Sequence, residues 1–213
     1  MKPESRKKIE TLIERYPALS VCRDDIVKAA ELMVRCYENG GKIMTCGNGG
    51  SAADAVHIVG ELMKGFCKRR ELPENEKNVL SAYGEEGRVL AENLQGTLAS
   101  VSLINEISLQ TAFSNDVLPE LGTAQQLYGL AEKGDVFIGI STSGNAKNLY
   151  YASIAAKAKG CSVVILSGRD GGILKRLADV SVIVPETETY KIQELHLPVY
   201  HAICLALEEE FFG

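Results

Sequence analysis

The sequence predicts a single doubly wound five-stranded parallel α/β sheet with an N-terminal helical extension. Short apolar segments alternate with longer segments whose apolar residues recur at helical spacing. Several short segments, such as VFIGI and SVVIL, are apolar throughout, as in strands that are covered on both faces. Glycine follows several helical segments, where it commonly ends a helix. Right-handed crossovers between successive strands then place helices on both faces of one sheet.

The chain has 213 residues, which favours one domain with a small extension. Helical spacing begins near the N-terminus, is interrupted at Pro17, and stops at Gly40 and Gly41. We therefore expect a helical extension at 1–41, followed by the sheet domain at 42–213 as one structural unit.

The strands are expected where the apolar runs are shortest and most continuous. The run before TLASVSL is harder to interpret, because it is polar and contains one proline. Five strands are predicted, at residues 42–46, 97–103, 135–141, 161–167 and 180–184.

Helices are expected between these strands. The polar excursion at 67–78 precedes a segment at 79–95 that has helical character, and the SND sequence at 114–116 is expected to break the helix before it. The predicted helices lie at 52–66, 104–113, 120–134, 145–160, 171–178 and 192–212.

The net charge of −5 disfavours a nucleic-acid-binding surface. No apolar run is long enough to span a bilayer, and the charged N-terminal segment has no apolar signal core. We therefore expect a cytoplasmic protein without nucleic-acid or membrane partners. Its six cysteines form no CxxC pair and are expected to be reduced residues of the core.

A glycine-rich loop follows the first predicted strand. It contains Asn48, Gly49, Gly50 and Ser51, and a helix begins directly after it. Glycine lets the backbone approach a ligand, and the first turn of a helix offers unpaired N–H groups to an anion. The loop lacks the spacing of a dinucleotide or nucleoside triphosphate motif. A tight turn without a ligand is the alternative interpretation.

A hydroxyl-rich loop follows the strand predicted at 135–141. Ser141, Thr142 and Ser143 precede Gly144 and the next helix, with no lysine or arginine in the loop. Hydroxyls and the start of a helix can hold a phosphate through neutral hydrogen bonds and the helix dipole. Helix capping is the alternative, but three adjacent hydroxyls exceed what one cap needs.

The chain contains three histidines. His57 and Glu61 share one face of the helix after the glycine loop, a spacing that suits a metal or an acid/base pair. We expect both near the mouth of the ligand cleft. The alternative for each histidine is a satisfied structural side chain.

Gln193, His196 and His201 lie on the last predicted helix. Gln193 and His201 are eight residues apart, ~12 Å along an ideal helix, which is too far for one ion to bridge. Either Gln193 precedes the regular helix, Pro198 bends it, or another subunit contributes. His196 projects ~140° away from His201 and is the weaker candidate.

Taken together, these segments resemble the sugar isomerase (SIS) domain, and within it the phosphoheptose isomerase family. The matching stretches cover most of residues 42–205 in the order and spacing of that family. They are CGNGGSAADAVHIVGEL, SND, GISTSGN, VVILSGRDGG and KIQELHLPVYHAI.

The resemblance implies a flavodoxin-like fold and a homotetramer with active sites at subunit contacts. It implies conversion of sedoheptulose 7-phosphate to glycero-manno-heptose 7-phosphate through an enediol. Glu61 would be the base, His201 the acid, and zinc a cofactor with one ion per subunit. The substrate-binding residues would be Asn48, Gly49, Gly50, Ser51, Asn115, Asp116, Ser141, Thr142, Ser143 and Gln193, and the zinc ligands His57, Glu61, Gln193 and His201.

Three alternatives differ in chemistry. The first is a non-catalytic SIS scaffold resembling the DnaA initiator-associating protein, which lacks the glutamate and histidine that match Glu61 and His201. The second is a sugar-phosphate-sensing regulator, for which the N-terminal extension is too short to hold a typical DNA-binding module. The third is an isomerase for another phosphosugar. The sequence does not decide whether the product feeds lipopolysaccharide, capsule or another glycan.

Overall fold

The computed structural model describes all residues 1–213. Five parallel strands form one sheet in the order β2-β1-β3-β4-β5. The predicted fold class is therefore confirmed. The strands are β1 (Ile43–Gly47), β2 (Ser100–Ser102), β3 (Val136–Ser141), β4 (Ser162–Ser167) and β5 (Val180–Ile183).

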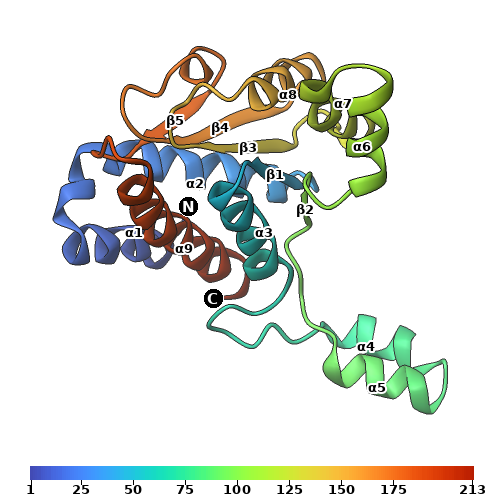
Figure 1. The fold of residues 1–213 in the computed structure, drawn as a ribbon. Helices are drawn as coiled ribbons and strands as arrows, with labels where there is room; N and C mark the ends of the chain where they lie inside the picture. The colour runs from blue at the N-terminus through green and yellow to red at the C-terminus, as the bar shows by residue number, and fades with distance from the viewer.

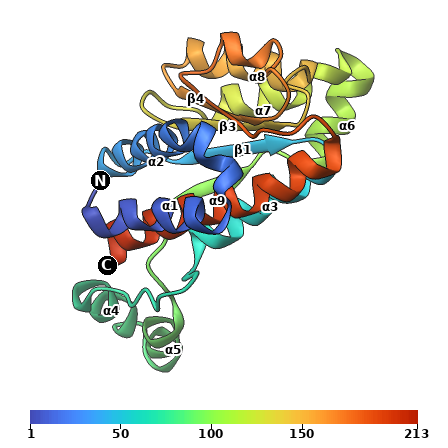
Figure 2. The ribbon, with the colours of Figure 1, turned by 90° about the vertical axis from the view of Figure 1, so that its left-hand side faces the viewer.

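Helices cover both faces of the sheet (Figure 1). On one face lie α1, α2, α3 and α9, and on the other α6, α7 and α8 (Figures 1 and 2). The α-helices are α1 (Pro3–Arg15), α2 (Arg23–Glu38), α3 (Gly50–Met63), α4 (Glu74–Ser81), α5 (Glu85–Asn93), α6 (Ile107–Asp116), α7 (Gly122–Leu130), α8 (Lys147–Ala158) and α9 (Thr189–Phe212), with 3₁₀ turns η1 (Pro17–Cys22), η2 (Pro119–Leu121) and η3 (Leu174–Arg176).

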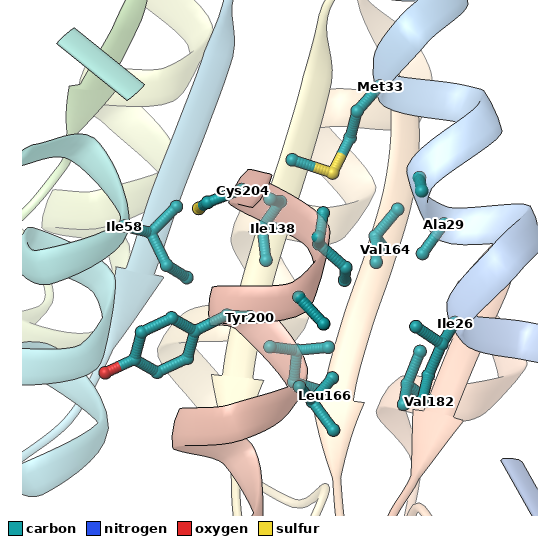
Figure 3. Packing of buried hydrophobic residues seen from close by; sticks show 14 of the residues in the cluster. Ile26, Ala29, Met33, Ile58, Ile138, Val164, Leu166, Val182, Tyr200 and Cys204 are labelled. Atoms are coloured by element: carbon teal, nitrogen blue, oxygen red, sulfur yellow. The ribbon is translucent and has the colours of Figure 1, made fainter. Parts of the chain in front are cut away.

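The strands divide their side chains between two cores because successive residues of a strand point to opposite faces. Ile138 and Val164 pack with α2, α3 and α9, whereas Phe137 and Ile165 pack with α7 and α8. Figure 3 shows the first core, where Tyr200 of α9 lies beside Ile58 of α3. The N-terminal helices contribute to this core through residues such as Ile9.

The structure differs from the predicted elements in four places. The helix predicted at 171–178 is only the 3₁₀ turn η3 (Leu174–Arg176). The segment at 79–95 is not one helix, because Gly84 adopts a left-handed φ of +87° between α4 and α5. The SND sequence does not break α6 but forms its last turn, and the helix ends at Asp116. The second strand contains only three residues.

Helices α4 and α5 form a hairpin that stands away from the rest of the molecule in both views (Figures 1 and 2). The two helices bury only Gly87 and Ala91, while Val79, Tyr83 and Val89 are exposed. Two short helices that bury so little surface are not stable alone. The hairpin therefore depends on contacts from outside itself.

None of the helices combines the length and the apolar character needed to cross a membrane. All six cysteines are free, and five of them are buried. The exception is Cys67, which is exposed, so the expectation that every cysteine belongs to the core was wrong for this residue.

Candidate active site

The glycine loop between β1 and α3 is shaped by its neighbours. Gly49 has a left-handed φ of +56°. A side chain at Gly47 would lie 2.3 Å from the carbonyl oxygen of Ser51. A side chain at Gly50 would lie 2.5 Å from Nε2 of Gln193, which reaches the loop from α9. The loop thus leaves its own backbone exposed and brings Gln193 to the start of α3.

The hydroxyl loop between β3 and α8 lies against the loop that follows β4. Gly144 has a φ of +67°, and a side chain there would overlap the carbonyl oxygen of Gly171 at 2.0 Å. The hydroxyl of Ser167 donates a hydrogen bond of 2.7 Å to the carbonyl of Ser141. The hydroxyls of Ser141 and Thr142 make no hydrogen bond within the protein, so they are available to a ligand.

The two loops meet where the strand order reverses. Strands β1 and β3 are neighbours, and the chain leaves them toward opposite edges of the sheet. In open parallel sheets, ligands bind beyond the carboxyl ends of the strands at this point. Asn48 and Asn148 join the two loops with reciprocal amide hydrogen bonds of 2.9 and 3.0 Å.

An open cleft of about 540 Å³ lies beside this junction. We call it the sheet-edge cleft. Asn48, Asn148 and Lys147 line it, and Lys147 is the one cation among the lining residues. The candidate residues Asn115 and Asp116 lie apart from it on the exposed last turn of α6, where the amide of Asn115 donates to the Asp116 carboxylate.

His57, Glu61 and His201 lie elsewhere, at the contact between α3 and α9 (Figure 2). We call this contact the α3–α9 seam. The rings of His57 and His201 meet edge to face with centroids 5.0 Å apart. Nε2 of His57 lies 3.1 Å from Oε1 of Glu61, and Lys64 donates to Oε2 of Glu61 at 2.8 Å. The structure thus brings Glu61 and His201 onto adjoining helices in one chain.

The seam does not open into the sheet-edge cleft, which differs from the sequence-based expectation. Helix α3 runs back along the sheet from the glycine loop, so Glu61 lies eleven residues, or ~16 Å, from the start of the helix. None of His57, Glu61 and His201 lines the cleft. One chain therefore carries two separate groups of candidate site residues.

Comparisons with known proteins identify the family of this chain. SIS domain models match residues 7–83 and 90–207. A phosphoheptose isomerase of Helicobacter hepaticus is 40% identical over 185 residues, which are 87% of this chain and 82% of the relative. This chain belongs to the SIS-domain phosphoheptose isomerase family. The resemblance inferred from the sequence motifs is confirmed, and the members of this family are aldose–ketose isomerases.

Other phosphoheptose isomerases are similar to this chain in sequence and in structure. That of Nitratiruptor is 39% identical over 189 residues, covering 89% of this chain and 88% of the relative. The solved structure from Neisseria gonorrhoeae has a TM-score of 0.71 at 32% identity, covering 97% of this chain and 92% of that one. The structure from Francisella tularensis has a TM-score of 0.75 at 27% identity, covering 94% of both chains.

The electrostatics of the seam favour an ionised carboxylate at Glu61. Burial acts to raise its pKa, but the hydrogen bond and charge of Lys64, together with His57, outweigh burial and lower the pKa. The pKa of His201 is lowered, first by burial and then by His57, with a smaller opposing effect of Glu61. This isomerase family member therefore holds a carboxylate beside a largely neutral imidazole.

Two further seam residues were not recognised in the sequence. The hydroxyl of Tyr200 lies 3.0 Å from Nδ1 of His57 and donates to Oδ1 of Asp54 at 3.3 Å. The three hydrogen bonds that join Glu61, His57, Tyr200 and Asp54 can form together when both nitrogens of His57 carry a proton. His57 then donates to Tyr200 and to Glu61, while Tyr200 donates to Asp54. Asp54 and Tyr200 are 146 positions apart, so no local pattern could have paired them.

His196 lies outside both groups. It is fully buried, and neither ring nitrogen has a hydrogen-bond partner. Burial lowers its pKa to about 4, and the backbone of Ser167 opposes this shift without reaching hydrogen-bond geometry. His196 is therefore a neutral core residue in this structure.

Proposed function

We propose that this protein converts sedoheptulose 7-phosphate to glycero-manno-heptose 7-phosphate through an enediol. The observation that carries the proposal is that Glu61 and His201 both contact His57 at the α3–α9 seam. Membership of the phosphoheptose isomerase family supports it. An isomerase for another phosphosugar would use the same two groups, so the sugar itself is the finer part of the proposal.

Glu61 is the proposed base. Aldose–ketose isomerisation moves one proton between C1 and C2, and a carboxylate can remove it from C1 and return it to C2. A base must be deprotonated at the working pH, and the lowered pKa of Glu61 meets that need. Lys64 holds one carboxylate oxygen and leaves the other beside His57.

His201 is the proposed acid for the oxygen atoms. It gives a proton to O2 as the enediol forms and accepts one from O1 as the aldehyde forms. Its lowered pKa favours a neutral ring, and a neutral imidazole can still polarise a carbonyl through its N–H group. Nε2 of His201 is buried without a protein partner, which leaves this nitrogen for the substrate.

The loops are the proposed substrate-binding elements. Ser141, Thr142 and Ser143 would bind the phosphate through hydroxyls and the start of α8. Asn48, Gly49, Gly50 and Ser51 would hold the sugar hydroxyls with Gln193, which lies against Gly50. Asn115 and Asp116 are exposed on α6 and would reach the substrate from that helix.

Zinc is also proposed. The donor types of His57, Glu61 and His201 suit zinc, and the unpaired Nε2 of His201 would bind either the ion or the substrate, not both at once. As they lie, no three histidine, cysteine or acidic side chains are close enough to hold an ion, because His57 binds Tyr200 and Glu61 instead. The ion would polarise the substrate carbonyl when bound. The steps above do not depend on it.

The fourth proposed ligand, Gln193, lies in the same continuous helix as His201. It therefore does not precede the helix, and within one chain it is too far from His201 to share an ion with it. A second subunit would have to supply it. Anomalous scattering from crystals of the protein would locate any zinc ion and show which subunit supplies its glutamine ligand. This test does not depend on turnover.

A homotetramer with shared active sites is the proposed assembly. The sheet-edge cleft and the α3–α9 seam of one chain are separate, and the distance along α3 exceeds the length of a seven-carbon sugar phosphate. A substrate whose phosphate lies on the hydroxyl loop of one subunit would place its carbonyl at the seam of another. The exposed apolar residues of the α4–α5 hairpin support an assembled form, because such a surface favours a protein contact.

Turnover of sedoheptulose 7-phosphate by the purified protein, with and without chelator, tests the reaction. We expect formation of the heptose phosphate. A panel of other ketose phosphates identifies the sugar. Absence of turnover with every ketose phosphate, combined with tight binding to a replication initiator, would favour the scaffold.

Mixing two inactive variants tests the shared site. Glu61→Gln removes the proposed base, and Thr142→Val with Ser143→Ala removes hydroxyls from the phosphate loop. Refolding the two chains together should restore activity if each site takes its loop and its base from different subunits. Recovery no greater than the sum of the two separate variants would place each site within one chain.

A further inference from the structure

The segment after α3 wraps around the end of α9 and is held there by a buried ion pair. Arg70 and Glu208 have relative exposures of 1% and 1%, and Nε of Arg70 donates to Oε1 of Glu208 at 2.9 Å. The ring of Phe212 lies 4.7 Å from the guanidinium carbon of Arg70. We call this pair the Arg70–Glu208 clamp.

Arg70 binds the carboxyl-terminal end of α3. Its Nη1 donates to the carbonyl of Leu62 at 2.7 Å, and its Nη2 donates to the carbonyl of Glu61 at 3.1 Å. The last carbonyls of a helix have no partner within the helix, and a cation there also interacts favourably with the helix dipole. The backbone of the proposed base is thus fixed directly by Arg70.

Glu208 binds the segment that follows. Its carboxylate accepts hydrogen bonds from the consecutive backbone N–H groups of Phe66, Cys67 and Lys68, at 2.7, 2.8 and 3.1 Å. Successive amides of this kind form a concave anion-binding nest. With Arg70, the carboxylate has four donors, so its buried charge is fully hydrogen-bonded.

The clamp also reaches His201. The ring of Phe66 lies 5.3 Å from the ring of His201, centroid to centroid. His201 and Glu208 are seven residues apart on α9, and this spacing places them on the same face. The two charges of the clamp therefore connect the backbone of Glu61 to the helix that carries His201.

We propose that Arg70 and Glu208 are positioning residues that set the distance between the Glu61 carboxylate and the His201 imidazole. The proposal rests on the proposed roles of Glu61 and His201 as base and acid. A buried ion pair is not needed for stability alone, since apolar side chains of similar size often serve as well. Its placement on the carbonyl of the base and on the nest beside the acid is what a positioning role requires.

The test compares Arg70→Lys and Arg70→Met with the unmodified protein. Lysine keeps the charge beside Glu208 but cannot donate to two carbonyls and a carboxylate at once. For Arg70→Lys we expect kcat to fall about 100-fold, the effect of a small misplacement of reacting groups, with KM nearly unchanged.

Asp135→Asn is the matched control. Asp135 is a buried carboxylate before the start of β3 that accepts backbone N–H groups of Lys42 and Glu132 and pairs with the Lys42 ammonium, and it makes no hydrogen bond or ion pair with Arg70 or Glu208. It should lower the melting temperature as the clamp variants do, while kcat measured on the folded protein stays as in the unmodified protein.

The outcomes separate the two proposals. Full activity of Glu61→Gln would remove the proposed base, whatever the clamp variants show. If Glu61→Gln is inactive, a wild-type kcat in folded Arg70→Lys would overturn the proposed positioning role of the clamp. Equal losses of kcat in Asp135→Asn and Arg70→Lys at equal loss of melting temperature would also overturn it. Should Arg70→Met fail to fold, Arg70→Lys still decides the question.

Discussion

The sheet-edge cleft and the α3–α9 seam are built from different materials. The glycine and hydroxyl loops beside the cleft each occupy a few consecutive positions, and the glycine loop lines the cleft through Gly47 and Asn48. The seam is formed by side chains on two helices, with partners such as Asp54 and Tyr200 that are 146 positions apart. The candidate phosphate-binding loop is therefore local in sequence, whereas the proposed acid/base pair depends on the packing of the whole domain.

The largest loss of activity is expected for Glu61→Gln at the seam. Loss of the carboxylate removes the base, and we expect the turnover of sedoheptulose 7-phosphate to fall about 10³-fold or more. Size-exclusion chromatography should show the same assembly as the unmodified protein. Retention of more than a tenth of the activity would mean that proton transfer from carbon does not use Glu61.

His201→Asn should be nearly as severe, with a loss of about 10²-fold or more, because no other unpaired imidazole lies at the seam. His196→Asn is the matched control, since His196 is buried in the core and should affect turnover less. Steady-state kinetics of both variants decide between them. Equal losses would mean that the wrong histidine has been assigned as the acid.

Thr142→Val probes the other region. The substitution removes one hydroxyl while keeping the shape of the side chain, so we expect KM for the sugar phosphate to rise about tenfold with little change in kcat. Thr142→Val and Glu61→Gln should differ in their kinetics, because the hydroxyl loop is expected to affect KM and the seam to affect kcat. A fall in kcat alone would place Thr142 with the catalytic groups.

The smallest expected effect is that of Lys64→Met. Lys64 helps to hold the pKa of Glu61 below its usual range, so removing it lets that pKa rise. The base must be deprotonated, and the acid limb of kcat/KM therefore moves to higher pH while activity well above the limb changes little. A pH–rate profile measures this shift, and an unmoved limb would show that another group titrates there.

Most of the fold could be predicted because its signals are local. Continuous apolar runs and glycine stops located all five strands, including β3 and β4 within one residue at each end. The errors lie where a local signal was weak or overridden. Ser114 to Asp116 carry loop-forming side chains, yet they form the last turn of α6, and Gly84 divides a segment that has helical spacing on both sides.

The site could be predicted only in part. The spacing of His57 and Glu61 placed both on one helix face, and the two remain in contact in the structure. Their distance from the cleft could not be inferred, since it depends on the direction in which α3 crosses the sheet. The role of Arg70 could not be predicted, because in the sequence it is one of several charged residues in the polar segment at 67–78. Only its burial against Glu208 distinguishes it from Arg69.

The α4–α5 hairpin has a consequence for the isolated chain. With Val79, Tyr83 and Val89 facing solvent, its helices gain little from folding on their own. In dilute solution, limited proteolysis should therefore cut this hairpin before the sheet is attacked. Raising the protein concentration should slow that cleavage if a second chain covers the same side chains.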